Sequence, residues 1–252
     1  ATKKDKYKKL IHNGSGSNLL FKQDYDGCLL HLKNDTIKVV EETGNFAIIQ
    51  TGGGLEWDDF VAWTVLHQYF GLENLSLIPG TTGATPVQNI GAYGTEVSEF
   101  IVKAEAISLQ DGHQKNFSSE ACQFAYRNSI FKHELRNQYL ITKVYYKLYK
   151  KPHFNLDYGS VKKEVQNLGE INQKNIRQAI MNIRNAKLPD TARTGNAGSF
   201  FKNPVVSKKF AEQLAARHPD MPQYKISSNN IKLAAGWLID QCGLKGYTND
   251  QG

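Results

Sequence analysis

Apolar and polar residues alternate along several stretches of the chain, and this period of two predicts β-strands. The clearest case is "YLITKVYYKLY" (139–149), in which apolar side chains recur on one face and Lys143 and Lys147 lie on the other. Similar patterns dominate residues 27–55 and 100–148. We therefore expect strands in both regions.

A period of three to four residues predicts four helices. The segment "WDDFVAWTVLHQYFG" (57–71) places apolar residues at helical spacing and ends in a glycine, a good C-terminal stop. The segment "NQKNIRQAIMNIRNAKLPD" (172–190) has the same spacing, and Pro189 prevents its continuation. Two more helices are expected over 207–217 and 231–242. This mixture, with the most helix in the last third, predicts the α+β class.

Composition narrows the class of protein further. The 252 residues are 40% hydrophobic and 22% charged, an ordinary mixture for one large domain or two to three small ones. No apolar run reaches the roughly 18 residues of a membrane span, and no secretory segment follows the first residues. The three cysteines form no CxxC pair and the seven histidines no metal-binding motif. We expect a cytoplasmic protein without disulfides, bound metal or membrane contact.

The formal charge of +7 favours anionic partners. The lysines are scattered along the chain and are not interleaved with a base-stacking motif, so we expect no nucleic-acid partner. A phosphate-bearing small molecule suits the same charge. Most of the lysines, taken singly, fit a solvated surface equally well.

Two segments are rich in small residues: "NGSGSNLLF" (13–21) and "IPGTTGATPVQNIGAYG" (78–94). Bare amides in such loops can bind phosphate oxygens, because glycine removes the side-chain obstruction. Neither segment is a Rossmann GxGxxG or a Walker A motif. A tight hairpin explains the first as well as a ligand does. The second is long and irregular, which in a compact domain is usually functional, and its amide side chains (Gln88, Asn89) could bind the edge of a heteroaromatic ring.

The decapeptide "GNAGSFFKNP" (195–204) sets Ser199 between small residues and two phenylalanines. Small residues allow close approach of a ligand, and the aromatic rings could exclude water from a site of proton transfer. A strand entry with a surface serine explains the same ten residues. The decapeptide alone leaves both readings open.

Six segments, in this order, resemble the UDP-N-acetylenolpyruvoylglucosamine reductase (UDP-N-acetylmuramate dehydrogenase) family, in its type I branch: "GSGSN", "GLENLSLIPGTTGATPVQNIGAYG", "YRNSIFK", "KLPD", "GNAGSFFKNP" and "LAAGWLIDQC". The resemblance covers nearly the whole chain. It implies a two-lobed FAD-binding domain of the vanillyl-alcohol-oxidase type, with lobes at 1–36 and 37–188, and a substrate-binding α+β lobe at 189–252. It also implies FAD as cofactor, NADPH as cosubstrate, a nucleotide-sugar substrate and a monomer.

The resemblance assigns roles to individual residues. Arg127 would be the catalytic arginine and Ser199 the proton donor. Contacts to the substrate would come from Tyr158, Lys187 and Asn203, although a lysine at a helix end and an asparagine in a turn before proline need no ligand. Sixteen residues of the two small-residue segments would hold FAD: Gly14, Ser15, Gly16, Ser17, Asn18, Pro79, Gly80, Thr81, Thr82, Gly83, Gln88, Asn89, Gly91, Ala92, Tyr93 and Gly94.

The chain also departs from this family. It ends at "QCGLKGYTNDQG", where relatives continue and supply a glutamate beside the serine, and relatives carry further residues before "GSGSN". We therefore expect lobes that are truncated at both ends. Two other functions stay open: a flavin-dependent oxidase of the same FAD-binding superfamily, and a non-catalytic nucleotide-sugar binding module.

Overall fold

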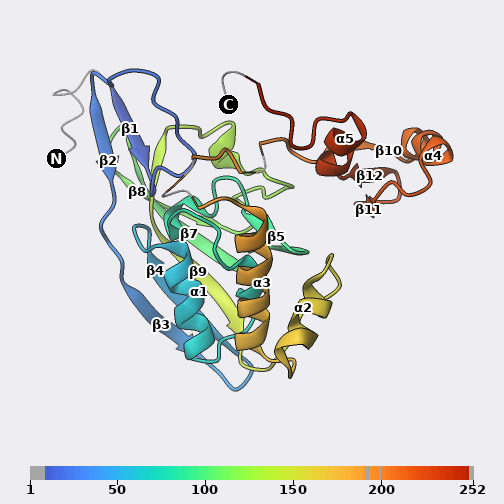
Figure 1. Cartoon of the computed structure of the whole chain (residues 1–252). Coiled ribbons are helices and arrows are strands. Elements are labelled where there is room, and N and C mark those ends of the chain that lie inside the picture. The colour runs from blue at the N-terminus through green and yellow to red at the C-terminus, as the bar shows by residue number, and fades with distance from the viewer. Residues whose placement is uncertain (1–8, 191–192, 194, 199, 250–252) are drawn as a thin grey trace. The chain divides into compact units, whose positions relative to one another are not determined.

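The computed structural model describes residues 9–190, 193, 195–198 and 200–249 (Figure 1). The chain divides into two compact units, residues 1–194 and 195–252. Both contain helices and strands, so the class is α+β, as the hydrophobic pattern predicts. No helix within the described ranges is long and apolar enough to cross a membrane.

A five-stranded antiparallel sheet forms the centre of the first unit. Two smaller two-stranded sheets accompany it, one parallel and one a short antiparallel hairpin. In spatial order the large sheet contains β3 (Ile37–Glu42), β4 (Phe46–Gly52), β9 (Tyr139–Tyr149), β7 (Ile101–Ser108) and β8 (Gln114–Ser118). The small sheets pair β1 (Leu10–Asn13) with β2 (Cys28–His31) and β5 (Gly91–Ala92) with β6 (Thr95–Glu96).

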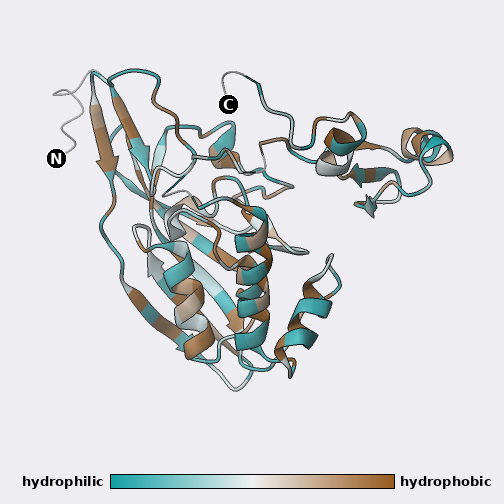
Figure 2. Cartoon of the chain, in the orientation of Figure 1, coloured by the Kyte–Doolittle hydropathy of each residue, from teal (hydrophilic) through white to brown (hydrophobic). Residues whose placement is uncertain are grey.

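Helices cover one face of the large sheet. Figure 1 shows α1 and α3 against it, with α2 beside α3. The helices of this unit are α1 (Trp57–Leu66), α2 (Val161–Leu168) and α3 (Gln173–Lys187), with 3-10 turns η2 (Glu73–Leu75), η3 (Thr82–Ala84), η4 (Val97–Glu99) and η5 (Ile130–Lys132). The apolar sides of these helices turn inward, as the brown and teal faces of α3 show (Figure 2).

From Val144 to Leu148 the side chains of β9 alternate as predicted. Val144, Tyr146 and Leu148 are fully buried in the core that includes Trp57 and Phe60 of α1. The prediction was wrong at the start of the strand, where Ile141 is buried and Leu140 is only partly buried. Burial of such apolar side chains is the main source of stability for a unit of this kind.

Two of the four predicted helices have a wrong end, and the other two are confirmed. The segment from Trp57 is helical only as far as Leu66, because the chain turns at His67 and Gln68, so the expected stop at Gly71 was wrong. The helix over 207–217 is confirmed as α4 (Lys208–Arg217). The helix expected from Ile231 was wrong at its start: Asn230–Leu233 is strand β12, and α5 begins only at Ala235.

The second unit is a small α+β arrangement. Its antiparallel sheet has the order β10 (Val205–Ser207), β12 (Asn230–Leu233), β11 (Gln223–Lys225), and its helices are α4 (Lys208–Arg217) and α5 (Ala235–Gln241). Its buried core is small, with Ala211, Met221 and Leu233 at the centre. Ser207 caps α4, since its side chain accepts a hydrogen bond from the amide of Phe210.

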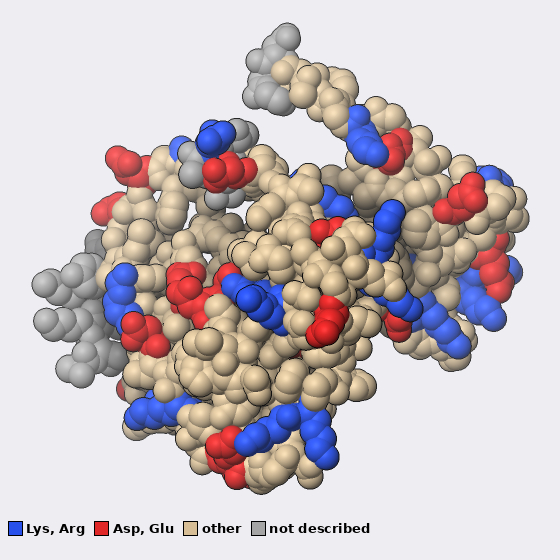
Figure 3. All heavy atoms as spheres, turned by 60° about the horizontal axis from the view of Figure 1, so that its bottom comes forward, with Lys and Arg blue, Asp and Glu red and all other residues tan. Residues whose placement is uncertain are grey.

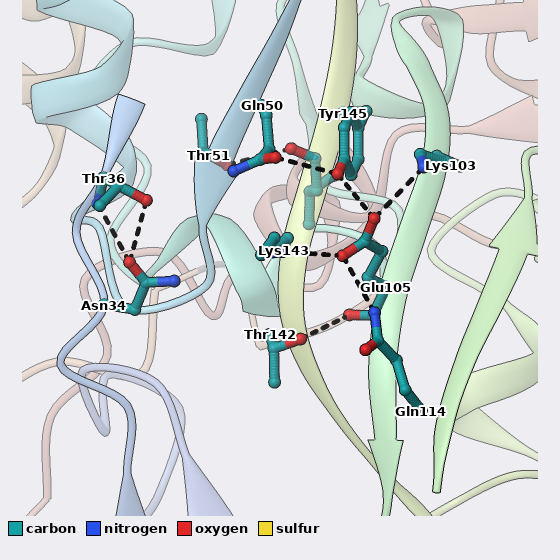
Figure 4. A network of polar contacts seen from close by, with 11 residues as sticks. Asn34, Thr36, Gln50, Thr51, Lys103, Glu105, Gln114, Thr142, Lys143 and Tyr145 are labelled. Carbon is teal, nitrogen blue, oxygen red and sulfur yellow. Dashed lines mark hydrogen bonds and ion pairs between the residues drawn. The ribbon is translucent and has the colours of Figure 1, made fainter. Parts of the chain in front are cut away.

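A polar network on the open face of the large sheet centres on Glu105 (Figure 4). Its Oε1 accepts hydrogen bonds from Lys103 Nζ (3.2 Å) and the Tyr145 hydroxyl (2.6 Å), and its Oε2 from Lys143 Nζ (3.0 Å) and Gln114 Nε2 (3.3 Å). Burial opposes ionisation of Glu105, but the hydrogen bonds from Tyr145 and the lysines outweigh it and lower its pKa. Burial together with this carboxylate raises the pKa of Tyr145 to about 12. The network joins β7, β8 and β9, and these four hydrogen bonds of the Glu105 carboxylate are all made within the sheet.

Charges of both signs are interspersed on the face shown in Figure 3. This distribution agrees with scattered lysines on a solvated surface rather than with a continuous basic band.

Candidate functional site

A cavity of about 610 Å³ opens in the first unit. Its volume lies within the range of small-molecule and cofactor sites, about 300–1,000 Å³. Three stretches of chain that are far apart in sequence form most of its wall: 12–19, 79–90 and 131–141. The first two are the small-residue segments, and the third joins η5 to β9.

The first wall is the loop that follows β1. Gly16 has a φ of 74°, a left-handed conformation that glycine adopts at low cost. The loop closes on itself through a hydrogen bond from the Leu19 amide to the Gly16 carbonyl (3.1 Å), and the Ser15 hydroxyl donates to Glu56 (3.2 Å). The backbone amides of residues 15–18 have no acceptor among the described residues. They are therefore available to an anionic ligand.

The second wall is the segment that contains η3, packed tightly against the ends of two strands. A Cβ on Gly83 would lie 2.8 Å from the carbonyl oxygen of Gly53 and 2.9 Å from that of Ile141. The Thr82 hydroxyl donates to the Gly52 carbonyl at 2.6 Å. The segment is thus fixed to β4 and β9 at the edge of the cavity.

The cavity suits a dinucleotide such as FAD. Its amides could bind a pyrophosphate, and apolar side chains such as Leu32, Ile90 and Phe131 could contact the rings. Asn13 also lines it, and its Oδ1 is buried with no hydrogen-bond partner in the described part of the chain. A buried acceptor left unpaired is costly, and a donor on a bound ligand would satisfy it.

Arg127 lies beside the last part of the second wall. Its Nη1 donates to the Asn89 carbonyl (3.3 Å) and pairs with Glu96 Oε1 (3.7 Å), and its Nη2 donates to the Gly91 carbonyl. Its own carbonyl accepts from Nζ of Lys132, which lines the cavity (3.2 Å). The guanidinium is therefore held next to the cavity wall and is only partly exposed.

Comparisons with known proteins cover most of the chain. Residues 3–118 match the "FAD binding domain" family, and residues 189–251 match the "UDP-N-acetylenolpyruvoylglucosamine reductase, C-terminal domain" family. The UDP-N-acetylenolpyruvoylglucosamine reductase of Neisseria gonorrhoeae is 48% identical over 239 residues, which are 93% of this chain and 68% of that protein. The enzyme of the same name from Bacteroides fragilis is 44% identical over 94% of this chain and 71% of its own length. This chain belongs to the UDP-N-acetylenolpyruvoylglucosamine reductase family.

A solved structure of the same family has a similar fold. The reductase from Thermus caldophilus aligns with a TM-score of 0.58 at 20% identity, over 94% of this chain and 68% of its own. The FAD-binding fold predicted from the six segments is thus confirmed. The lobe boundaries at 36/37 and 188/189 stay predictions.

Many of the sixteen residues expected to hold FAD in this family member lie in the cavity wall. The ten that line it are Gly14, Ser15, Gly16, Ser17, Asn18, Pro79, Gly80, Thr81, Gly83 and Gln88. The six placed elsewhere are Thr82, Asn89, Gly91, Ala92, Tyr93 and Gly94. Contacts of all sixteen with FAD stay predictions. Of the six, Thr82 and Asn89 are buried and make hydrogen bonds within the protein.

The third wall of the reductase cavity was not anticipated from the sequence. It brings Lys132, His133 and Arg136 to the cavity, a cationic side that suits phosphates. The segment contains no glycine, and its clustered basic residues were the only available signal. His12, at the end of the first strand, was missed as well, and burial lowers its pKa.

Tyr158 is packed against the second small-residue segment. Its ring meets that of Tyr93 edge to face at 6.1 Å. Asn155 Nδ2 donates to the Gly94 carbonyl (3.0 Å), and buried Asn74 donates to the carbonyls of Tyr93 and Asn155 (2.9 and 2.8 Å). The loop that carries Tyr158 is thus joined to the same short hairpin that holds Arg127.

The remaining predicted site residues are placed as follows. Ser199 lies outside the described residues. Lys187 is exposed in the last turn of α3, where its charge is favourable against the helix dipole. Asn203, in the second unit, accepts a hydrogen bond at Oδ1 from the Ala235 amide at the start of α5 (2.9 Å). Their contacts with a substrate stay predictions.

Proposed function

We propose that this chain is an FAD-dependent oxidoreductase that reduces the enolpyruvyl group of UDP-N-acetylglucosamine enolpyruvate and so forms UDP-N-acetylmuramate for peptidoglycan synthesis. NADPH is the hydride donor, and the enzyme works in the cytoplasm as a monomer. One observation carries the proposal. The segment 78–94 lines the FAD-sized cavity with its first half and holds the guanidinium of Arg127 with its second.

Amides of the first loop and of the second segment would hold the pyrophosphate of FAD. When bound and reduced by NADPH, FAD would supply a hydride. Lys132 and Arg136 of the third wall would add positive charge near the phosphates. Asn13 Oδ1, which has no partner in the described part of the chain, would accept a hydrogen bond from the dinucleotide.

Reduction of the enolpyruvyl double bond requires a hydride at one carbon and a proton at the other. Negative charge develops on the second carbon and its carboxylate during the reaction. Arg127 binds this carboxylate, because a planar guanidinium can donate two parallel hydrogen bonds and stays charged at any working pH. Ser199 donates the proton. A hydroxyl is a weak acid, but position matters more than acidity when the acceptor is a strongly basic carbon.

Three more residues have proposed roles in binding the sugar nucleotide. Tyr158 covers it, Lys187 supplies a point charge for its pyrophosphate and Asn203 supplies a hydrogen bond. These roles rest on the family resemblance and on the presence of Tyr158 on the hairpin that holds Arg127.

Flavin spectroscopy tests this function directly. The purified chain is reconstituted with FAD, and NADPH is added without oxygen. The flavin bands should bleach, and UDP-N-acetylglucosamine enolpyruvate should restore them, whereas UDP-N-acetylglucosamine should not. Restoration by oxygen at a catalytic rate, and not by the enolpyruvyl sugar, would favour the oxidase. Binding of the sugar nucleotide without any binding of FAD would favour a non-catalytic module.

A further inference from the structure

Glu96 lies at the end of β6, beside Arg127. Its Oε1 pairs with Arg127 Nη1 at 3.7 Å, and its Oε2 accepts a hydrogen bond from Asn89 Nδ2 at 2.8 Å. The carboxylate therefore contacts the guanidinium on one side and a buried amide on the other.

Asn89 makes this arrangement rigid. It is 1% exposed, and its Nδ2 also donates to the Ala125 carbonyl (3.1 Å) while its Oδ1 accepts from the Ser98 amide (3.1 Å). All the hydrogen-bonding capacity of the Asn89 amide nitrogen is used. Glu96 is thereby tied to a fixed group, unlike a typical surface ion pair between two mobile side chains.

The contacts of Arg127 leave one edge of its guanidinium open. A guanidinium has five N–H donors. Nη1 faces the Asn89 carbonyl and Glu96, and Nη2 donates once to the Gly91 carbonyl. Nε and one hydrogen of Nη2 have no acceptor among the described residues. Nε and Nη2 form the edge of a guanidinium that can bind a carboxylate with two parallel hydrogen bonds.

We propose that Glu96 is a positioning residue, which holds Arg127 so that its Nε–Nη2 edge faces the substrate carboxylate. This inference rests on the proposed function. Without Glu96, the Nη1 end has only a long hydrogen bond to the Asn89 carbonyl, and the guanidinium can turn that end to the substrate instead. A small rotation moves the fork away from the carboxylate, and such misplacement is costly in a site that depends on orientation.

The experiment compares two ligands that differ by the carboxylate. Titration of the FAD-bound protein with UDP-N-acetylglucosamine enolpyruvate and with UDP-N-acetylglucosamine, followed calorimetrically, gives an affinity for each. The test variants are Glu96→Ala and Glu96→Gln. Glu99→Ala is the matched control, because Glu99 Oε1 accepts from the Glu96 amide (2.6 Å) and Glu99 makes no hydrogen bond or ion pair with Arg127 in the described part of the chain. Arg127→Lys keeps the positive charge but removes the two parallel donors, so it measures how much they add to binding of the carboxylate.

Glu96→Ala should weaken binding of the enolpyruvyl ligand about tenfold, the lower end of the cost of losing one charged hydrogen bond, and leave UDP-N-acetylglucosamine unchanged. Glu96→Gln should recover only part of this loss, since its one amide oxygen can accept from Asn89 Nδ2 while its amide nitrogen, a donor, then faces Nη1. Glu99→Ala should bind both ligands as the parent does.

Parent-like affinities of Glu96→Ala for both ligands would overturn the inference. Equal losses for both ligands would also overturn it, because they indicate general damage to the loop, which thermal unfolding of the variants would reveal. If instead the parent binds neither ligand, or Arg127→Lys does not weaken the enolpyruvyl ligand selectively, the proposed role of Arg127 fails, and the inference fails with it.

Discussion

Substitution of Gly83 by alanine should weaken both the fold and FAD binding. The added methyl group would lie 2.8 Å from the Gly53 carbonyl oxygen, 2.9 Å from that of Ile141 and 3.0 Å from the Gly53 Cα. All three are backbone atoms at the ends of β4 and β9, so no side chain can rotate to make room. The segment around η3 must move, and it carries amides that line the cavity.

Overpacking of this kind costs about 1–3 kcal/mol. In a unit of this size, each kcal/mol lowers the melting temperature by about 2–4 °C, so we expect a decrease of about 2–12 °C. Displacement of one amide from the pyrophosphate adds a loss of FAD affinity of about tenfold or more. Thermal unfolding without FAD and fluorescence titration with FAD measure the two effects separately.

Gly44→Ala is the control for Gly83→Ala. Gly44 lies in the turn between β3 and β4, and a Cβ there would meet nothing within 4 Å. This variant should match the parent in both assays. A Gly83→Ala protein that melts within about 1 °C of the parent and binds FAD equally well would refute the packing argument.

Three further outcomes are expected. Ser199→Ala is made in a version of the protein that carries the C-terminal segment of its relatives. This variant should keep reduction of the flavin by NADPH but slow oxidation of the flavin by the enolpyruvyl sugar about 10²- to 10⁴-fold, measured by stopped-flow absorbance. Ser199→Cys should lose less of this rate. Burial raises the pKa of Glu73 above its ordinary 4.5, so between the two pKa values the native state keeps a proton that the unfolded state has lost. The free energy of unfolding, measured by urea titration, should therefore fall as the pH rises from about 4.5 through the folded pKa. The Glu73→Gln variant should lack this decline. Initial rates with varied NADPH and sugar should give parallel double-reciprocal lines, and intersecting lines without substrate inhibition would argue against a shared cleft.

Local pattern was sufficient for the regular elements of the fold. The strand β9 and the helix α3 were predictable because each has a period that a buried face imposes. The helix α2 escaped prediction, because only Val161 and Val165 are buried in its eight residues and the others, apart from exposed Leu168, are polar. The start of α5 was misjudged because Ile231 and Leu233 continue its apolar pattern while pairing with β10 and β11. Pairing with distant strands, which no local pattern records, decided the outcome there.

The candidate site was predictable where glycine marks it and hidden where it does not. Two walls of the cavity follow from runs of small residues, which signal bare backbone in the sequence itself. The third wall, with Lys132 and Arg136, reaches the cavity only because β9, which follows it, packs against η3. Likewise, nothing in the spacing of Glu96 and Arg127 indicates that a hydrogen-bonded asparagine joins them.

Left-handed backbone around Arg127 adds to the case for a functional site there. Asn89, Tyr93 and Arg127 have φ values of 45°, 47° and 54°. Such residues cost roughly 1–2 kcal/mol each relative to ordinary backbone, less for asparagine, and glycine would avoid the cost. Left-handed residues also occur in turns such as the one at Gln68, so the conformation alone does not mark a site. What distinguishes these three is their place at one hairpin: Asn89 precedes β5, Tyr93 lies between β5 and β6, and Arg127 donates to the carbonyls of Asn89 and Gly91.

The hairpin explains how this cost is offset. Arg127 donates to the carbonyls of Asn89 and Gly91, and Asn74 donates to the carbonyl of Tyr93, so side chains fix the strained backbone. A chain selected only for stability would place glycine at these positions. Two of these side chains make contacts that glycine cannot make: Arg127 donates to the carbonyls of Asn89 and Gly91, and the Tyr93 ring packs against Tyr158. Replacement of Tyr93 by glycine should therefore relieve backbone strain and yet loosen the loop that carries Tyr158.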